Sequence, residues 1–425
     1  MLLLFIGGLH AAGCDAPRLR LPDLWALPVN YVEPAPPSGG PVDVYLDATL
    51  SMQGYVNAGD QATYLKVIER LGSEAVLGGS RSYYKFGSAV TQIGDGQYRE
   101  ARRAAFYTDP NFNRQTFIEN VVADADTGHL NIIVTDLFQD DGNVNALVSG
   151  LRNKALLNGK AVGIAAIKSE FRGTIYDVGI RKEKYNYQGE RPFYLVTFGA
   201  FGDVARLFDN LDRAGRSDEV KQEYLIFSAH IAQPVVSFVR LASDPDFSDT
   251  VIEPEKFKDR PAVKYFRVRG QEEETSVSAR FTLSLRPYRP LYDPTRITYG
   301  VKAWRQEADT LLADEKGGRA LSISVLESSD TTLALHLNLP SYSELAQDRY
   351  FFELDVRPSS DAYRLPEWVE KWNLDMSMAE AWRANPSAFT GDKTQNLVHF
   401  LNDLLHINVE GAKPTLARLY FFVDR

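Results

Sequence analysis

The hydrophobic pattern of residues 42–220 alternates between continuous apolar runs and segments with helical spacing. Four largely apolar runs are candidates for buried strands: VDVYLD, HLNIIVTDLF, KAVGIAAIK and PFYLVTFGA. Helical segments lie between several of them, one with Tyr64, Ile68 and Leu71 on a single face. Buried strands that alternate with helices are typical of a parallel sheet covered by helices on both faces. The pattern therefore predicts an α/β domain with a doubly wound, mostly parallel sheet.

The pattern changes from residue 221 onward. Short runs follow one another, several with strict alternation of apolar and polar residues, as at Val277, Phe281 and Leu285. Such alternation predicts antiparallel strands with one face in water. We therefore expect residues 221–425 to form a β-sandwich-like region. It should include a late amphipathic helix, TQNLVHFLNDLLHI, capped by Thr394, and a last strand, LARLYFFVD, that returns to the sheet.

Residues 1–14 have a different character. The apolar run from Met1 ends in small residues immediately before Cys14, the one cysteine of the chain. An apolar segment followed by small residues is typical of a secretory signal. The sequence AAGC resembles the lipobox of bacterial lipoproteins, which implies lipidation of Cys14 and a lipid-anchored protein of the bacterial envelope. In the resembling proteins, Asp15 would favour the inner membrane, facing the periplasm, over the outer membrane. The alternative is a hydrophobic N-terminal helix or strand with a free thiol.

Residues 15–41 are rich in proline. They contain seven of the 21 prolines, and proline fixes φ and removes a backbone donor. This composition predicts an extended, semi-rigid tether that could reach ~80 Å, at about 3.1 Å per residue. Its scattered leucines indicate partial docking on a folded domain.

Charge and cysteine content narrow the classes of partner and site. The net charge is −9, which disfavours a nucleic-acid backbone and suits metal cations and basic protein surfaces. A single cysteine excludes an intrachain disulfide and a thiolate metal cluster.

Oxygen-bearing side chains gather where the predicted strands end. Asp47, Thr49 and Ser51 follow the first strand at alternate positions, Asp136 follows IIVT, and Thr116 precedes a helix. Ligands of doubly wound folds bind beyond the carboxyl ends of the strands. A few carboxylates with neutral hydroxyls suit a small divalent cation that keeps some of its waters. The sequence therefore predicts a Mg²⁺ or Mn²⁺ site.

This set of residues resembles the metal-ion-dependent adhesion site of the von Willebrand factor A domain. That family carries Asp-x-Ser-x-Ser after the first strand, a Thr in a later loop and an Asp after the fourth strand, often followed by Gly. Here DATLS places Thr49 at the first Ser position, and VTDLF lacks the Gly after Asp136. The resemblance covers residues 42–215. It implies metal-dependent binding of a protein partner that offers an acidic side chain to the ion.

Several alternatives stay open from the residues alone. Thr49 and Ser51 could belong to a helix cap, and Thr108 or Thr135 could take the place of Thr116. An envelope hydrolase of the phosphoesterase type could use a metal held by Asp47 and Asp136. The sequence offers no Ser-His-Asp arrangement and no histidine beside Ser51, so a binding protein is the expected class and a hydrolase the alternative.

Residues 169–191 interrupt the family pattern. The usual helical connection is replaced by a segment rich in Tyr, Gly and charge, which predicts a hairpin insertion. Tyr176, Tyr185 and Tyr187 beside basic residues would form a partner-binding surface. Alternatively, these tyrosines pack on the body of the protein.

Overall fold

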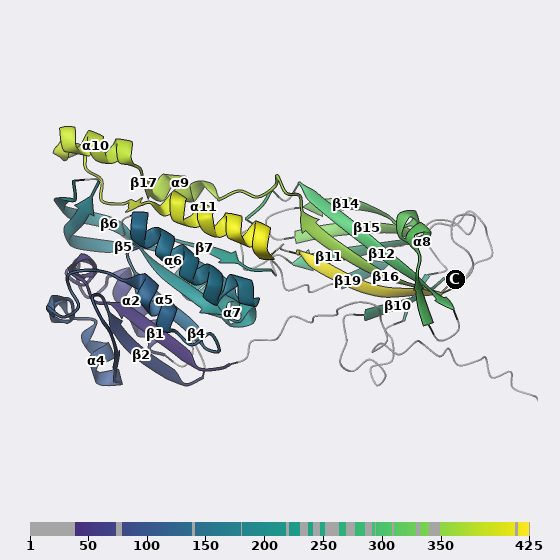
Figure 1. The fold of residues 1–425 in the computed structure, drawn as a ribbon, viewed down its shortest axis with the longest axis horizontal. Coiled ribbons are helices and arrows are strands. Elements are labelled where there is room, and N and C mark those ends of the chain that lie inside the picture. The colour runs from purple at the N-terminus through teal and green to yellow at the C-terminus, as the bar shows by residue number, and fades with distance from the viewer. Residues whose placement is uncertain are drawn as a thin grey trace, which may run out of the picture.

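A computed structural model describes most of the chain from residue 39 onward. The described residues are 39–73, 79–137, 141–179, 181–217, 221–229, 237–240, 247–250, 263–268, 277–284, 291–293, 295–307, 310–328, 332–339, 349–412 and 415–424. They form an α/β half and a β half that lie side by side (Figure 1). No helix among them is both long and apolar enough to span a membrane.

A seven-stranded sheet is the core of the α/β half, with the strand order β3-β2-β1-β4-β6-β5-β7. The strands are β1 (Val42–Asp47), β2 (Arg81–Phe86), β3 (Val90–Ile93), β4 (Leu130–Thr135), β5 (Ala161–Val178), β6 (Glu183–Gly199) and β7 (Gln222–Phe227). β1 pairs in parallel with β2 and β4. The pairs β2–β3, β4–β6, β6–β5 and β5–β7 are antiparallel. The α/β class is thus confirmed, and the sheet is mixed.

The antiparallel half of this sheet follows from the hairpin insertion. β5 and β6 pair along almost their whole length, and the predicted insertion 169–191 is their shared outer part and turn. Without a crossover helix, the second strand must run back beside the first. β6 therefore inserts between β4 and β5, which differs from the parallel order that the sequence predicted.

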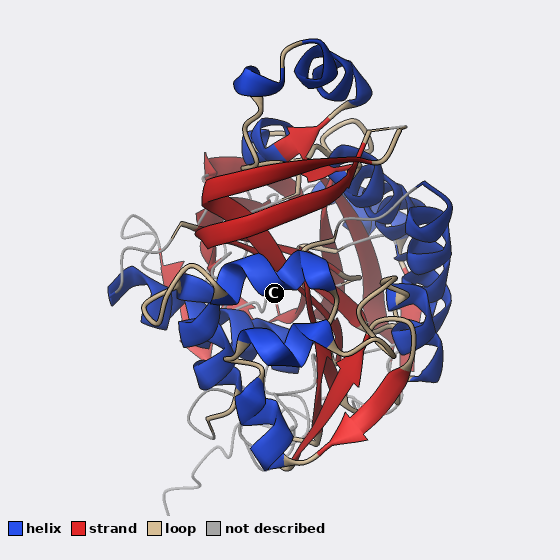
Figure 2. Ribbon diagram, turned by 90° about the vertical axis from the view of Figure 1, so that its left-hand side faces the viewer, coloured by secondary structure: helices blue, strands red, loops and turns tan. Residues whose placement is uncertain are grey.

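Helices cover both faces of the sheet, as the end-on view in Figure 2 shows. One face packs against α1 (Gln53–Val56), α2 (Thr63–Leu71) and α7 (Phe201–Ser217). The other packs against α5 (Ile118–Asp124), α6 (Asp141–Lys154) and α11 (Leu397–Ile407). Short helical segments complete this half: η2 (Leu50–Met52), α4 (Asp95–Glu100), η3 (Ala104–Thr108) and η4 (Leu156–Asn158).

Two further sheets form the β half. Their orders are β13-β12-β16-β19-β10-β9 and β14-β15-β11-β8. Buried residues of both sheets share one core, among them Leu335 of β15 and Phe352 of β16. All pairs are antiparallel except β10–β19. The elements are β8 (Ser237–Arg240), β9 (Phe247–Thr250), β10 (Val263–Val268), β11 (Val277–Ser284), β12 (Ile297–Glu307), β13 (Thr310–Ala313), α8 (Glu315–Ala320), β14 (Ser322–Ser328), β15 (Thr332–Leu339), β16 (Arg349–Pro358) and β19 (Ala417–Asp424).

The chain returns to the first sheet between β16 and β19. This return segment contains α9 (Glu367–Trp372), β17 (Asn373–Leu374), α10 (Met376–Ala384), η5 (Pro386–Ala388), β18 (Thr394–Gln395), α11 and a π-helical turn (Asn408–Ala412). The sequence assigned all of it to the β-rich C-terminal region, whereas in the structure α11 lies beside α6 (Figure 1).

The late helix has the predicted apolar face. Leu397, Phe400, Leu401, Leu404 and Leu405 are all buried. Its predicted cap is wrong, because the N-cap residue is Asn396. Thr394 instead lies in β18, and its hydroxyl accepts a hydrogen bond from Tyr194.

Candidate metal centre

The ends of two parallel strands bring the candidate ligands together. Asp47 is the last residue of β1, and Thr135 is the last residue of β4. The register pairs Leu46 with Val134, so the residues after both strands lie at the same edge of the sheet. Asp47 and Asp136, which are distant in sequence, thus become neighbours.

A chain of hydrogen bonds joins four of the five predicted residues. Both the backbone N–H and the hydroxyl of Thr49 donate to Asp47 Oδ1, at 3.0 and 2.6 Å. Ser51 Oγ lies 3.1 Å from Thr49 Oγ1, and the hydroxyl of Thr116 donates to the same oxygen over 3.3 Å. The oxygens of Asp47, Thr49, Ser51 and Thr116 therefore form one cluster.

The loop that carries Thr116 is fixed to the sheet edge. Backbone bonds connect Ser88 to Phe112 and Phe117 to Gly87. A Cβ at Gly87 would lie 2.0 Å from the Phe112 carbonyl oxygen, so this close approach requires glycine. Lys85 adds an ion pair with Asp109 at 3.0 Å. These contacts place Thr116 beside Thr49.

Thr135 and Thr108, the two alternatives to Thr116, make other contacts. The hydroxyl of Thr135 donates to Asp47 Oδ2 over 2.8 Å, so it orients Asp47, while Thr116 contacts Thr49. Thr108 is directed elsewhere, because its hydroxyl donates to the carbonyl of Ala105.

Two carboxylates, Asp47 and Asp136, lie near each other at this site. Asp47 is fully buried. Burial, and after it the nearby Asp136 carboxylate, raise its pKa from 3.8 to about 7, against the lowering effect of the Thr49 and Thr135 hydrogen bonds. Desolvation and a neighbouring like charge both disfavour the ionised form. A cation between the two carboxylates would relieve both effects.

Sequence reasoning missed Arg191, which faces the same site. Its guanidinium Nη2 lies 3.3 Å from Asp136 Oδ2, and both side chains are almost completely buried. Arg191 precedes the apolar part of β6, and the pairing of Thr135 with Tyr194 brings that end of β6 to the site. The sequence predicted the hairpin insertion at residues 169–191, but not that β6 would then lie beside β4, so Arg191 was not linked to Asp136.

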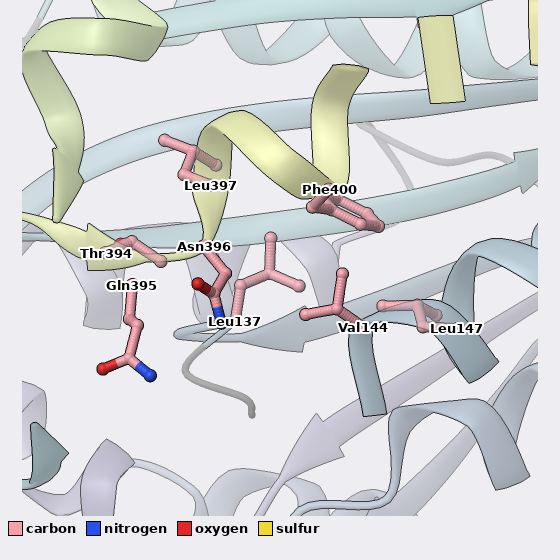
Figure 3. Close-up of a pocket in the computed structure, with 8 residues that line it drawn as sticks. All are labelled: Leu137, Val144, Leu147, Thr394, Gln395, Asn396, Leu397 and Phe400. Atoms are coloured by element: carbon pink, nitrogen blue, oxygen red, sulfur yellow. The ribbon is translucent and has the colours of Figure 1, made fainter. Parts of the chain in front are cut away.

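Leu137 replaces the glycine that is often found after this aspartate. It adopts φ +54°, the left-handed conformation that favours glycine. Its side chain is buried and lines a small cavity together with Val144, Leu147, Leu397 and Phe400, among others (Figure 3). Packing against α6 and α11 therefore holds a backbone turn for which the sequence offered no glycine.

The donor set fits a small hard cation. Octahedral Mg²⁺ with ligands at about 2.1 Å places neighbouring oxygens about 3 Å apart. The distances of 2.6, 3.1 and 3.3 Å between the oxygens of Asp47, Thr49, Ser51 and Thr116 are close to that spacing. Within the described part of the chain, no three His, Cys, Asp or Glu side chains gather at a metal site. A cation here would depend on hydroxyl oxygens for most of its protein ligands.

The hairpin tyrosines lie largely against their own chain. Tyr185 stacks on Phe389 with ring centroids 4.2 Å apart, and Tyr187 meets the same ring edge-on. Lys184 lies over the ring of Tyr176. The structure thus agrees with the alternative in which Tyr185 and Tyr187 pack on the body of the protein.

Two other predictions concern parts of the chain outside the described residues. Cys14 with residues 1–13, and residues 15–38 of the predicted tether, lie there. Lipidation and anchoring therefore stay predictions.

Comparison of the chain with protein-family models and with curated proteins finds no match.

Proposed function

We propose that this protein is a metal-dependent binding module, similar to a von Willebrand factor A domain, that presents a Mg²⁺ or Mn²⁺ ion to a protein partner. The observation that carries the proposal is the single oxygen cluster of Asp47, Thr49, Ser51 and Thr116, with Asp136 close enough to raise the pKa of Asp47. The strand order β3-β2-β1-β4 and the helices on both faces support the same comparison.

The burial pattern indicates the side from which a partner would approach. Asp47, Thr49 and Asp136 are buried, whereas Ser51 and Thr116 are partly exposed. A hydroxyl that donates one hydrogen bond still has oxygen lone pairs for a cation. An ion held on this side would keep at least one position toward solvent, which a carboxylate of the partner could occupy.

The hydrolase alternative gains no specific support from the geometry. Both oxygens of Asp47 already accept hydrogen bonds from Thr49 and Thr135, and its side chain is closed to solvent. A general base needs access to the proton that it removes, so in a hydrolase Asp47 would act only by holding the ion.

The proposal predicts that removal of Asp47 abolishes ion binding. The wild type should bind Mn²⁺ in calorimetry, and Asp47→Ala should reduce affinity at least 100-fold, because it removes the carboxylate that bonds to Thr49 in the oxygen cluster. Thr49→Ala should weaken binding about tenfold, since a neutral hydroxyl is a poorer ligand than a carboxylate.

Asp43→Asn is the matched control for this experiment. Asp43 is a buried aspartate on the same strand, and it contacts His129 at 2.8 Å near the opposite end. Its substitution should leave Mn²⁺ affinity unchanged. Failure of the wild type to bind Mn²⁺ or Mg²⁺ at millimolar concentration, even with a partner present, would refute the metal site.

We also propose that the protein is lipid-anchored in a bacterial envelope, on the basis of AAGC at residues 11–14, and in the inner membrane rather than the outer, on the basis of Asp15. Cys14→Ser should move the protein from the detergent phase to the aqueous phase in Triton X-114 partitioning, because serine lacks the thiol that would carry the lipid. Stable attachment needs two or more acyl chains, and the variant would have none at this position. Equal partitioning of wild type and variant would contradict lipidation.

A further inference from the structure

Arg191 connects the candidate metal centre to the return segment. While Nη2 contacts Asp136, Nη1 donates to two backbone carbonyls, Gly391 at 3.1 Å and Lys393 at 3.4 Å. These carbonyls precede β18 and the start of α11. One buried guanidinium therefore holds a ligand of the site and residues 391–393 at the same time.

The guanidinium and a bound cation would compete for the same carboxylate. Both are positive, and both would be stabilised by Asp136. Like charges within a few ångströms repel strongly inside a protein, where the effective dielectric constant is low. A cation bound to Asp136 would therefore weaken the ion pair between Arg191 and Asp136. It would also weaken the hydrogen bonds that Arg191 donates to the carbonyls of Gly391 and Lys393.

A second contact couples the same two regions. Leu137, the residue after Asp136, packs in the cavity that Leu397 and Phe400 line. The backbone of Leu137 is fixed in the left-handed conformation. A movement of Asp136 would therefore also move the packed side chain of Leu137. The hydroxyl of Tyr194 also bonds to Thr394 at 2.9 Å. A shift of Asp136 toward an ion would thus reach the start of α11 through side chains in direct contact.

From these contacts we propose that Arg191 is an internal competitor of the cation for Asp136, and that its displacement transmits ion occupancy to residues 391–397. This inference rests on the proposed metal-dependent function and adds its regulation. In the metal-free protein Arg191 neutralises Asp136 and keeps residues 391–393 of the return segment in place through its two hydrogen bonds. In the metal-bound protein that hold is weaker, so the side of the molecule formed by the return segment differs between the two states.

The test compares three proteins by Mn²⁺ calorimetry and by hydrogen exchange of peptides that cover residues 389–400. In the wild type, Mn²⁺ should increase exchange in this segment at least threefold. Arg191→Met should bind Mn²⁺ about tenfold more tightly, because the competitor is gone, and its segment should exchange rapidly with or without the ion.

Lys168→Met is the matched control. Lys168 also holds the return segment, through an ion pair with Asp392 at 3.5 Å and a contact with the ring of Trp372. No contact between Lys168 and Asp136 is seen among the described residues. This variant should loosen the segment, leave Mn²⁺ affinity within twofold of the wild type and keep the response to Mn²⁺.

Arg191→Lys covers the case in which Arg191→Met does not fold. Lysine keeps the charge but cannot bridge a carboxylate and two carbonyls with one planar group. Its Mn²⁺ affinity should stay near that of the wild type while the segment loses its response to the ion.

The outcomes separate the two proposals. Mn²⁺ binding by the wild type without a change in exchange at residues 389–400 would overturn the coupling and leave the metal site intact. An Arg191→Met protein that binds Mn²⁺ no more tightly than Lys168→Met would do the same. Absence of any ion binding by the wild type would refute the metal-dependent function itself.

Discussion

At pH 8 in EDTA, the Asp47→Asn protein should be more stable than the wild type by about 2 to 4 kcal/mol. Asp47 is fully buried beside Asp136, which raises its pKa to about 7, so at pH 8 the wild type must keep an unfavourable buried charge. Asparagine removes that charge. The estimate allows for the Thr135 hydrogen bond, which the amide cannot accept in the same way.

The pH dependence of this difference has a definite sign. The native-state pKa of about 7 lies above the ordinary value of 3.8. The folded protein therefore binds the proton more tightly than the unfolded chain does. The contribution of Asp47 to stability is complete below about pH 4 and is lost as the pH rises through 7. Urea unfolding at pH 4 to 8 should show the two proteins nearly equal at the acid end and furthest apart at pH 8.

Mn²⁺ should narrow this difference at pH 8, by about 1.4 kcal/mol at a tenfold excess of free ion over its dissociation constant. An ion that binds the native wild type stabilises it by mass action, and Asp47→Asn offers no carboxylate for that ion. The same urea series in EDTA and in 10-fold excess of ion over its dissociation constant therefore checks both charge and metal. If Asp47→Asn is less stable than the wild type at pH 8 in EDTA, the charge repulsion inferred here is absent.

Leu137→Gly should be more stable than Leu137→Ala by about 1 kcal/mol, although glycine is the smaller residue. Both substitutions remove a buried leucine that packs near Phe400, which typically costs about 2 to 5 kcal/mol. Glycine, however, adopts φ +54° without strain, and alanine does not. Urea unfolding free energies of the two variants measure this difference directly.

Leu147 provides the matched pair of control variants, because it lines the same cavity from within helix α6. In a helix interior glycine is about 1 kcal/mol worse than alanine. Leu147→Gly should therefore be less stable than Leu147→Ala, the opposite order to that at residue 137. The same order at both positions would show that the backbone at Leu137 stores no strain.

The elements of the fold were predictable where local pattern alone decides them. The apolar runs that became β1 and β4, and the buried face of α11, follow from side-chain periodicity, which is a local property. The directions of β6 and β7 were missed, although the hairpin insertion at residues 169–191 that reverses the chain was itself predicted. They depend on whether a helix or a hairpin joins β5 to β6, and a buried strand has the same composition in either direction.

For the candidate site, the sequence determined the groups at the ends of β1 and β4, because parallel neighbours deliver their carboxyl ends to one edge of the sheet. Asp47, Thr49, Ser51 and Asp136 could be grouped on that basis, and Thr116 through the resemblance to the von Willebrand factor A domain. The structure joins Asp47, Thr49, Ser51 and Thr116 in one hydrogen-bonded cluster. Only the tertiary structure decided that Arg191 faces Asp136 and that residues 391–393 lie against it. Those contacts join positions 55 and about 200 residues apart, and they arise from the packing of a hairpin and a returning segment. The local pattern of apolar and polar residues cannot predict packing between segments so far apart in the sequence.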